Sequence, residues 1–183
     1  MVHVVRRLLG AFLVLAIVAG ATLALSSRPR LQSDRNAVER DWRTVQPGLS
    51  ARYARVDALA RSISDAGGPT NPLIGEVEST YASWKPLTAD DPVAHSITLA
   101  NTLEGFARRL DVLVTGSPLL TANTTVSKAH QQMLDDATIP TGVTPLNDDI
   151  ARYEKDRGGP VRRIVAGPLG FSAIPRLALA TGA

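Results

Sequence analysis

Apolar residues recur at steps of three and four along residues 31–63, the pattern of a long helix that buries one face. The seam consists of aliphatic residues and one tryptophan: Leu31, Val38, Trp42, Val45, Leu49, Val56, Leu59 and Ile63. A seam of this length has to be covered by other helices. Pro47 and Gly48 fall between seam positions, on the expected outer face, so we predict a kink at Pro47 that does not end the helix. Gly67-Gly68-Pro69 is expected to end it.

Trp42 is the largest residue of the predicted seam. If its ring is buried, Trp42→Ala should lower the free energy of unfolding by about 3–5 kcal/mol. The melting of a fragment from about Leu31 onward measures this, and a near-neutral effect would mean that the ring faces solvent or a partner.

Four later helix starts share one pattern, a capping residue followed by proline: Asn71-Pro72, Asp91-Pro92, Ser117-Pro118 and Thr144-Pro145. The side-chain oxygen caps free amide groups, and proline at the first helical position loses no hydrogen bond. Each pair precedes apolar residues at helical spacing; after Ser117-Pro118 these are Leu119, Ala122, Val126, Ala129 and Met133. Short connections indicate antiparallel neighbours. The sequence predicts an all-α fold, an N-terminal transmembrane helix followed by an antiparallel helical bundle with a long first helix and four to five helices.

The N-terminal transmembrane helix is predicted from an uncharged run over residues 8–27, which follows a short basic stretch at residues 1–7. Twenty residues at about 1.5 Å each give roughly 30 Å, the thickness of a bilayer's hydrocarbon core. A cleaved signal peptide is the alternative, with Ala24-Leu25-Ser26 as the cleavage site. The predicted partner of residues 8–27 is the lipid bilayer.

Two features of this anchor bear on its neighbours and its orientation. Ala16, Gly20 and Ala24 form a small-residue stripe at spacing four, which is typical of pairing transmembrane helices and allows self-association. Arg6 and Arg7 precede the run, but arginines also follow it at positions 28, 30 and 35, so the side of the helical domain stays open.

The remaining chain divides into a helical domain over residues 28–157 and an apolar, Gly/Pro-rich tail over residues 158–183. We expect the long helix from Pro92 to return beside the first helix, with the helix from Pro72 as an excursion at the far end. The helix from Pro118 then runs out and the helix from Pro145 back. This order brings residues 162–171 of the tail either to the membrane surface or onto the base of the bundle, where they cap the core.

Composition agrees with helix packing and narrows the function. Hydrophobic residues make up 44% of the 183 residues but aromatic ones only 4%, so the core is aliphatic. The net charge is +3, and two of these charges are Arg6 and Arg7. No basic face with interleaved aromatic residues is visible, so no nucleic-acid partner is predicted. The absence of cysteine excludes disulfides, thiol catalysis and cysteine-bound zinc.

Several segments in order resemble the LemA family of bacterial membrane-anchored helical proteins. They are Asn36-x-Val38, Asp41-Trp42-x-x-Val45, Leu49-x-x-Arg52-Tyr53-x-x-Val56-x-x-Leu59, Ser117-Pro118-Leu119-Leu120-x-Ala122-Asn123, Leu146-Asn147-Asp148-x-Ile150-x-x-Tyr153 and Ile164-Val165-Ala166-Gly167-x-x-Gly170-Phe171. The resemblance covers about residues 31–174 and implies the fold and the membrane location, without an assigned reaction. The chain departs from the family at Ala54-Arg55-Val56-Asp57-Ala58 and at residues 139–145.

The candidate chemical groups are few. His3, His95 and His130 fall in separate segments, and His130-x-x-Met133 supplies two ligands at most, so no metal or cofactor site is predicted. Adjacent acids on a helix point about 100° apart, so the pairs Asp90-Asp91, Asp135-Asp136 and Asp148-Asp149 do not converge on one substrate atom. Arg108-Arg109 is interpreted as a solvated face.

These observations favour a non-enzymatic interaction or scaffold module of the cell envelope, with no catalytic residues. An envelope enzyme, hydrolytic in kind, with a site that the sequence does not reveal, is the alternative.

Overall fold

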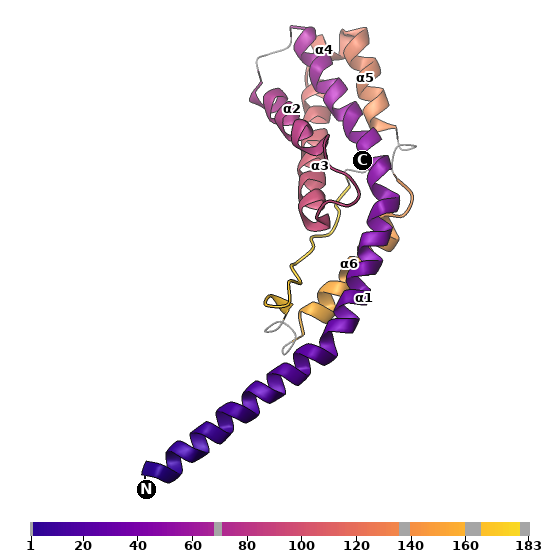
Figure 1. Ribbon diagram of the computed structural model, residues 1–183. Coiled ribbons are helices and arrows are strands. Elements are labelled where there is room, and N and C mark those ends of the chain that lie inside the picture. The colour runs from indigo at the N-terminus through magenta and orange to yellow at the C-terminus, as the bar shows by residue number, and fades with distance from the viewer. Residues whose placement is uncertain (1, 68–70, 136–139, 160–165, 180–183) are drawn as a thin grey trace. The chain divides into compact units, whose positions relative to one another are not determined.

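The computed structural model describes residues 2–67, 71–135, 140–159 and 166–179, and describes side chains from Arg28 onward. These residues form six helices and no strand (Figure 1): α1 (Val2–Asp65), α2 (Pro72–Trp84), α3 (Val93–Thr115), α4 (Pro118–Ala122), α5 (Thr124–Leu134) and α6 (Val143–Arg157). The predicted all-α class is confirmed, with more helices than the four to five expected.

The chain divides into two compact units, each built from segments far apart in the sequence. Unit 1 comprises Met1–Val38 and Asp148–Ala173, and unit 2 comprises Glu39–Asn147 and Ile174–Ala183. Helices α1 and α6 therefore each supply residues to both units.

The predicted seam of α1 is buried throughout. All eight seam residues from Leu31 to Ile63 have no exposed surface, and neither do Tyr53 and Ala60 beside them. The helix passes through Pro47 without ending, as predicted. The outer-face prediction holds for Pro47, which is exposed, and is wrong for Gly48. A Cβ added at Gly48 would lie 2.7 Å from the Cβ of Pro140, so this proline, in the turn before α6, packs directly on the glycine.

Two of the predicted capping residues act as expected. The Asn71 side chain accepts a hydrogen bond from the Leu73 amide at 3.0 Å, and Ser117 accepts one from Leu120 at 3.4 Å. Proline occupies the first turn of both α2 and α4. The end of α1 is also confirmed, because Gly67 has a φ of +65° directly after the last turn.

The other two starts differ from the prediction. Asp91 does not cap α3, because its carboxylate accepts hydrogen bonds from the amide and hydroxyl of Thr88 instead. Helix α6 begins at Val143 rather than at Pro145, because Gly142, with a φ of +104°, already makes the turn into it.

The helix predicted from Pro118 is two helices, α4 and α5. Asn123 ends the first and caps the second, its side chain accepting hydrogen bonds from the amides of Thr125 and Val126. The register of the apolar residues changes at this break: Leu119, expected in the core, is 85% exposed, whereas Leu120 is buried.

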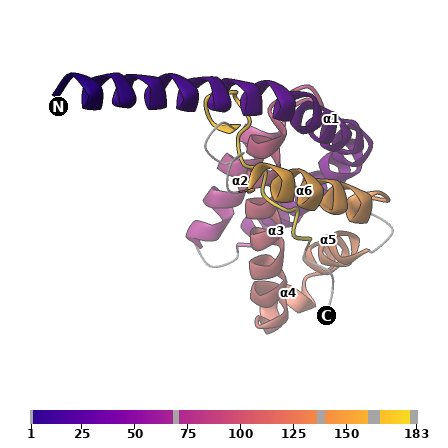
Figure 2. The ribbon, with the colours of Figure 1, turned by 90° about the horizontal axis from the view of Figure 1, so that it is seen from below.

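Residue pairs in unit 2 give the directions of its helices. Arg43 pairs with Asp90, and Ser50 with Trp84, so the chain returns along α1 through α2. Glu76 of α2 pairs with Arg109 of α3, so α3 runs antiparallel to α2 and parallel to α1. The expectation that α3 runs back along α1 is therefore wrong: α2 makes that return, and α3 lies beside α1 in the same direction, where Glu104 binds Arg52. Figures 1 and 2 show α3 between α2 and α5.

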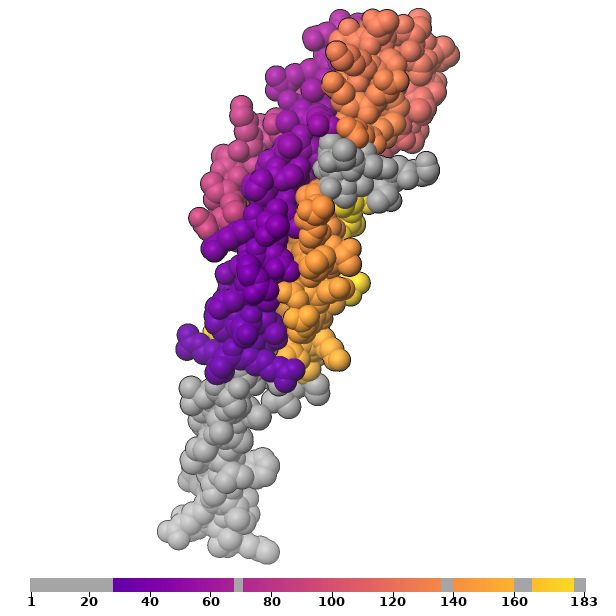
Figure 3. Space-filling model, turned by 90° about the vertical axis from the view of Figure 1, so that its right-hand side faces the viewer, coloured from indigo at the N-terminus to yellow at the C-terminus, as the bar shows by residue number. Residues whose placement is uncertain are grey.

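Unit 1 packs the end of α6 along α1 after Arg28, as Figure 3 shows for one face. Leu31 and Val38 of α1 and Tyr153 of α6 are buried there. The Tyr153 hydroxyl donates a 2.7 Å hydrogen bond to the Ser172 carbonyl, which ties the tail to this helix. Phe171 of the tail is only 3% exposed. Of the residues expected to cap the core or meet the membrane, 162–165 lie outside the described residues and Leu169 is half-buried, while Ala166 and Phe171 are buried.

The predicted anchor, residues 8–27 with Ala16, Gly20 and Ala24, lies outside the residues whose side chains are described, as do residues 1–7. In the part of the chain that the structure does describe, none of the helices has the length and apolar character needed to cross a bilayer.

Candidate functional site

The histidines singled out in the sequence do not meet in the structure. His95 is exposed on α3, and the Nε2 atom of His130 on α5 lies 2.7 Å from the Oδ1 atom of Asp111 on α3. Met133, one turn after His130, is buried in the core. Among the described residues no group of three or more histidine or acidic side chains is placed to hold a metal ion. The side chain of His3 is not described.

The acidic pairs are distributed over separate partners. Asp90 pairs with Arg43 at 3.1 Å, Asp135 with Arg55 at 3.7 Å and Asp149 with Arg152 at 2.9 Å. Asp148 is exposed, and Asp136 lies outside the described residues. The paired carboxylates therefore bind separate arginines rather than facing one substrate position.

Asp91 has a structural task in the turn before α3. The Thr88 amide donates to its Oδ2 atom at 2.6 Å and the Thr88 hydroxyl donates at 3.0 Å. These two bonds stabilise the ionised carboxylate and lower its pKa. The carboxylate thereby closes the loop between α2 and α3.

A buried ion pair lies in the core of unit 2. Arg52 of α1 binds Glu104 of α3 through two parallel hydrogen bonds, Nε to Oε1 at 2.7 Å and Nη2 to Oε2 at 3.1 Å. The side chains are 5% and 0% exposed. This fork geometry is the strongest form of an arginine–carboxylate pair. The sequence pattern did not reveal it, because Arg52 falls at a seam position and Glu104 within a helical face that otherwise reads as apolar.

A cluster of three aromatic rings adjoins this ion pair through Tyr53, which interacts with Glu104. Trp84 makes edge-to-face contacts with Trp42 and with Tyr53, at centroid distances of 6.3 Å and 4.9 Å. Its Nε1 atom donates to the Ser50 hydroxyl at 3.2 Å. Burial, together with the negative charge of Glu104, raises the pKa of Tyr53 well above its usual range, so its phenol stays neutral. These ring contacts join α1 and α2 next to the Arg52–Glu104 pair, which joins α1 and α3.

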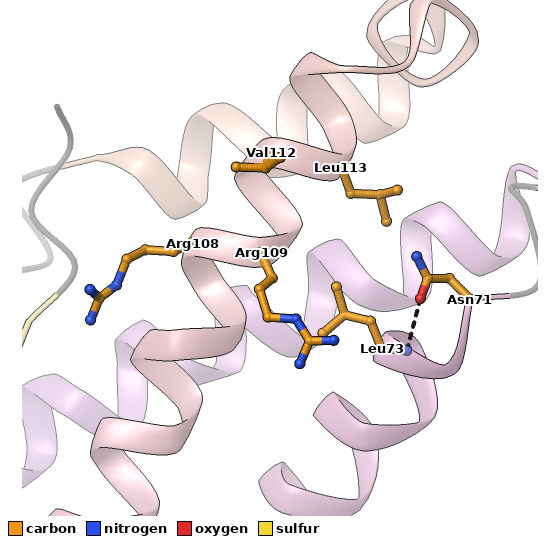
Figure 4. A pocket seen from close by; sticks show the side chains of 6 residues that line it. All are labelled: Asn71, Leu73, Arg108, Arg109, Val112 and Leu113. Carbon is orange, nitrogen blue, oxygen red and sulfur yellow. Dashed lines mark hydrogen bonds between the residues drawn. The ribbon is translucent and has the colours of Figure 1, made fainter.

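The candidate site on the surface is a pocket of about 400 Å³ between α2 and α3. Its lining comprises Asn71, Leu73, Arg108, Arg109, Val112 and Leu113 (Figure 4). The α3 residues recur at steps of three and four, so one helical face supplies them. Figure 4 shows the Arg109 guanidinium directed toward Leu73, while Arg108 extends from α3 in the opposite direction.

Apolar and cationic groups are combined in this pocket, which we call the α2/α3 pocket. Val112 is 69% exposed although it is a large aliphatic residue. Arg109 is held by Glu76 at 3.1 Å and stacks 5.7 Å from the centroid of the Phe106 ring. Arg108 is exposed beside it. Arg108-Arg109 is therefore solvated, as predicted, but the pair also forms one border of a pocket, which the sequence did not show.

A second pocket, of about 520 Å³, lies at the start of α6. It is lined by residues 140–145, Asn147, Leu177 and Leu179, so the tail forms part of its wall.

Comparison of the chain with protein-family models, with curated proteins and with solved structures gives no match in any of the three.

Proposed function

We propose that this protein is a membrane-anchored, non-enzymatic interaction module of the bacterial cell envelope, similar to the LemA family. Residues 8–27 are its proposed anchor, and the α2/α3 pocket is its proposed contact with a partner protein. The exposed Val112 carries this proposal, because an aliphatic side chain exposed in a pocket bordered by arginines is a feature of protein interfaces.

The chemistry of the pocket indicates the kind of partner. Leu73, Val112 and Leu113 supply an apolar floor, and Arg108 supplies a positive charge at its border. A short amphipathic segment that carries an acidic residue next to leucine or a similar side chain matches both. Arginine is enriched among the residues that contribute most to the binding energy of such interfaces.

Site-specific photo-crosslinking in intact membranes tests this function. A photoreactive residue in place of Val112 should give a discrete crosslinked product, and Arg108→Glu should reduce that product strongly because it reverses the border charge. Lys128→Glu, an exposed charge reversal on α5, is the matched control and should leave the product unchanged. A product that is insensitive to Arg108→Glu, or no product, would contradict a partner at this pocket. Hydrolytic activity of the purified protein would instead support the enzyme alternative.

The resemblance to the LemA family belongs to this proposal. It is supported by the burial of its first-helix segment: Leu49, Arg52, Tyr53, Val56 and Leu59 are all at most 4% exposed. Residues shared for packing would have to lie in the core in this way.

The anchor has its own test. The protein should stay in the membrane fraction after a carbonate wash and keep residues 1–27, because an uncharged run of roughly 30 Å spans a bilayer. A mature protein that begins at Ser27 would replace the anchor by a cleaved signal. If the anchor pairs through Ala16, Gly20 and Ala24, Gly20→Leu should weaken self-association in detergent.

A further inference from the structure

The tail passes through unit 2 as an extended segment held by two asparagines. Residues 174–179, here called the tail segment, have no helical structure. Asn101 of α3 donates to the Arg176 carbonyl at 2.8 Å and accepts from the Ala178 amide at 2.8 Å. Asn147 of α6 donates to the Leu177 carbonyl at 2.9 Å and accepts from the Leu177 amide at 2.9 Å.

These four hydrogen bonds hold the segment from both edges. In an extended chain the amide and carbonyl of one residue point to one side, and the flanking carbonyl and amide point to the other. Asn147 therefore binds the edge that Leu177 presents, and Asn101 binds the opposite edge. Both side chains act as a peptide group of a neighbouring strand would. We call this pair the asparagine clamp.

The asparagine clamp binds only backbone groups of the tail segment. Two buried side chains of the segment determine which of its residues align with the clamp. Ile174 and Leu177 are 7% and 3% exposed, whereas Pro175, Arg176 and Ala178 are exposed. Beyond Leu177 the segment borders the 520 Å³ pocket at the start of α6, which Leu179 also lines. An extended peptide with an apolar residue at every third position is the ligand that this arrangement fits.

The tail segment belongs to unit 2 by contact but not by chain continuity. The other part of unit 2 ends at Asn147, and residues 148–173, which lie between, belong to unit 1. Inside unit 2 the segment is therefore an added piece, comparable to a bound peptide. Identical copies of such a piece can be exchanged between chains without any new contact, and a reciprocal exchange closes a two-fold dimer.

We propose that the asparagine clamp is a peptide-binding site and that its ligand, besides the chain's own tail segment, is the tail segment of a second copy of this protein. The chain's own segment holds the site by its high effective concentration. A second copy takes its place when the resident segment is weakened or when copies are concentrated in one membrane.

Two full-length variants in mild detergent test the exchange. The first keeps the clamp and loses the tail segment through Leu177→Asp with Ala178→Pro, which removes the apolar anchor and the amide that Asn101 binds. The second keeps the tail segment and loses the clamp through Asn101→Ala with Asn147→Ala. The two variants carry different affinity tags, and circular dichroism verifies that each is folded. Ala178→Pro alone and Asn101→Ala alone serve where a double variant does not fold.

The mixture of the two variants should form a one-to-one complex, which co-purification and light scattering detect. Only the mixture combines an intact clamp on one chain with an intact, unbound tail segment on the other. Restoring Asn147 to the second variant should weaken this complex by about tenfold or more, since its own clamp then competes for the tail. Asn36→Ala is the control substitution, because Asn36 bonds only to Gln32 on its own helix in the hydrogen bonds shown. Two results would overturn the proposal: folded variants that form no mixed complex, or a complex that persists when both chains carry the disabled tail.

Discussion

Arg52 lies seven residues after Val45 and seven before Leu59, at a seam position where its neighbours are apolar. Glu104 compensates its charge from α3, with both side chains almost completely buried. Withdrawing two charges from water costs several kcal/mol per ion, and the paired geometry offsets most of that cost. The pair therefore fixes which face of α3 meets α1 more than it adds stability.

Removing one partner of this pair should be severe. Glu104→Ala should lower the free energy of unfolding by about 3–5 kcal/mol, because it removes the carboxylate that binds the buried Arg52 guanidinium through two hydrogen bonds. Arg52→Met combined with Glu104→Leu should recover most of that loss. Urea unfolding followed by fluorescence of the nearby tryptophans measures both. Glu76→Ala is the control, since its partner Arg109 is 56% exposed and such pairs contribute about 1 kcal/mol or less. A Glu104→Ala effect as small as the control would contradict this account.

Asp34 gives unit 1 a dependence on pH. Burial raises its pKa above 3.8, with a further contribution from the hydrogen bond and negative charge of Asp156, and Arg30 and Arg152 counteract only part of this. The folded state therefore binds the proton more tightly than the unfolded state does. Stability from this group is complete below the unfolded pKa and is lost as the pH rises through the folded pKa.

Asp34→Asn removes that dependence, because the amide does not ionise. The variant should gain stability relative to the parent as the pH rises above the ordinary aspartate pKa of about 3.9, because only the parent then has to ionise this carboxyl in its folded state. Thermal unfolding of both proteins across this range gives the difference, in which the other titrating groups cancel. A difference that is constant with pH, or that changes in the opposite direction, would show that Asp34 is not the group responsible.

At the scale of elements, the capping residues and the apolar period predicted that the helices exist more reliably than they predicted where each helix begins and ends. Asn71 and Ser117 cap as expected, because the side chain and the amides it binds lie within three residues. Asp91 could accept hydrogen bonds either from the first amides of α3 or from the preceding loop, and in the structure the Thr88 amide of that loop is its donor. Asn123 reads as an ordinary helical residue in the apolar pattern, although asparagine is also a strong cap. Such competition depends on the neighbouring loops and is not visible in a helical period.

The break between α4 and α5 depends on Asn123. Asn123→Ala removes the acceptor for the amides of Thr125 and Val126 and should cost about 1 kcal/mol. Hydrogen exchange at those two amides should accelerate, while the interior of α3 keeps its protection. Lys128→Ala, at an exposed position within α5, should change neither quantity. Unchanged exchange at Thr125 would mean that α4 and α5 behave as one continuous helix, as the apolar spacing alone predicts.

At the scale of the whole molecule, the seam of α1 was predictable because burial follows directly from the period of the apolar residues. The places of α2 and α3 were not, because short connections specify antiparallel neighbours without saying which helix returns beside α1. The α2/α3 pocket was also outside the reach of the sequence, since Leu73 and Val112 come together only once those two helices pair. The asparagine clamp is a further case: neither Asn101 nor Asn147 differs in the sequence from a solvated helical residue.

Phe171 of the tail allows a test between two explanations for this segment, which are packing in the core of unit 1 and contact with a membrane. Phe171 is 3% exposed in unit 1, so Phe171→Ala in the full chain should lower the free energy of unfolding by about 3–5 kcal/mol. Leu119→Ala is the matched control, because Leu119 is 85% exposed and its loss should change stability by about 0.5 kcal/mol or less. If the ring instead entered a membrane interface, the substitution would leave the unfolding free energy unchanged and would weaken flotation with anionic vesicles. Measuring unfolding and flotation on the same two variants distinguishes core capping from membrane contact, because burial within the protein predicts a change in the first quantity alone.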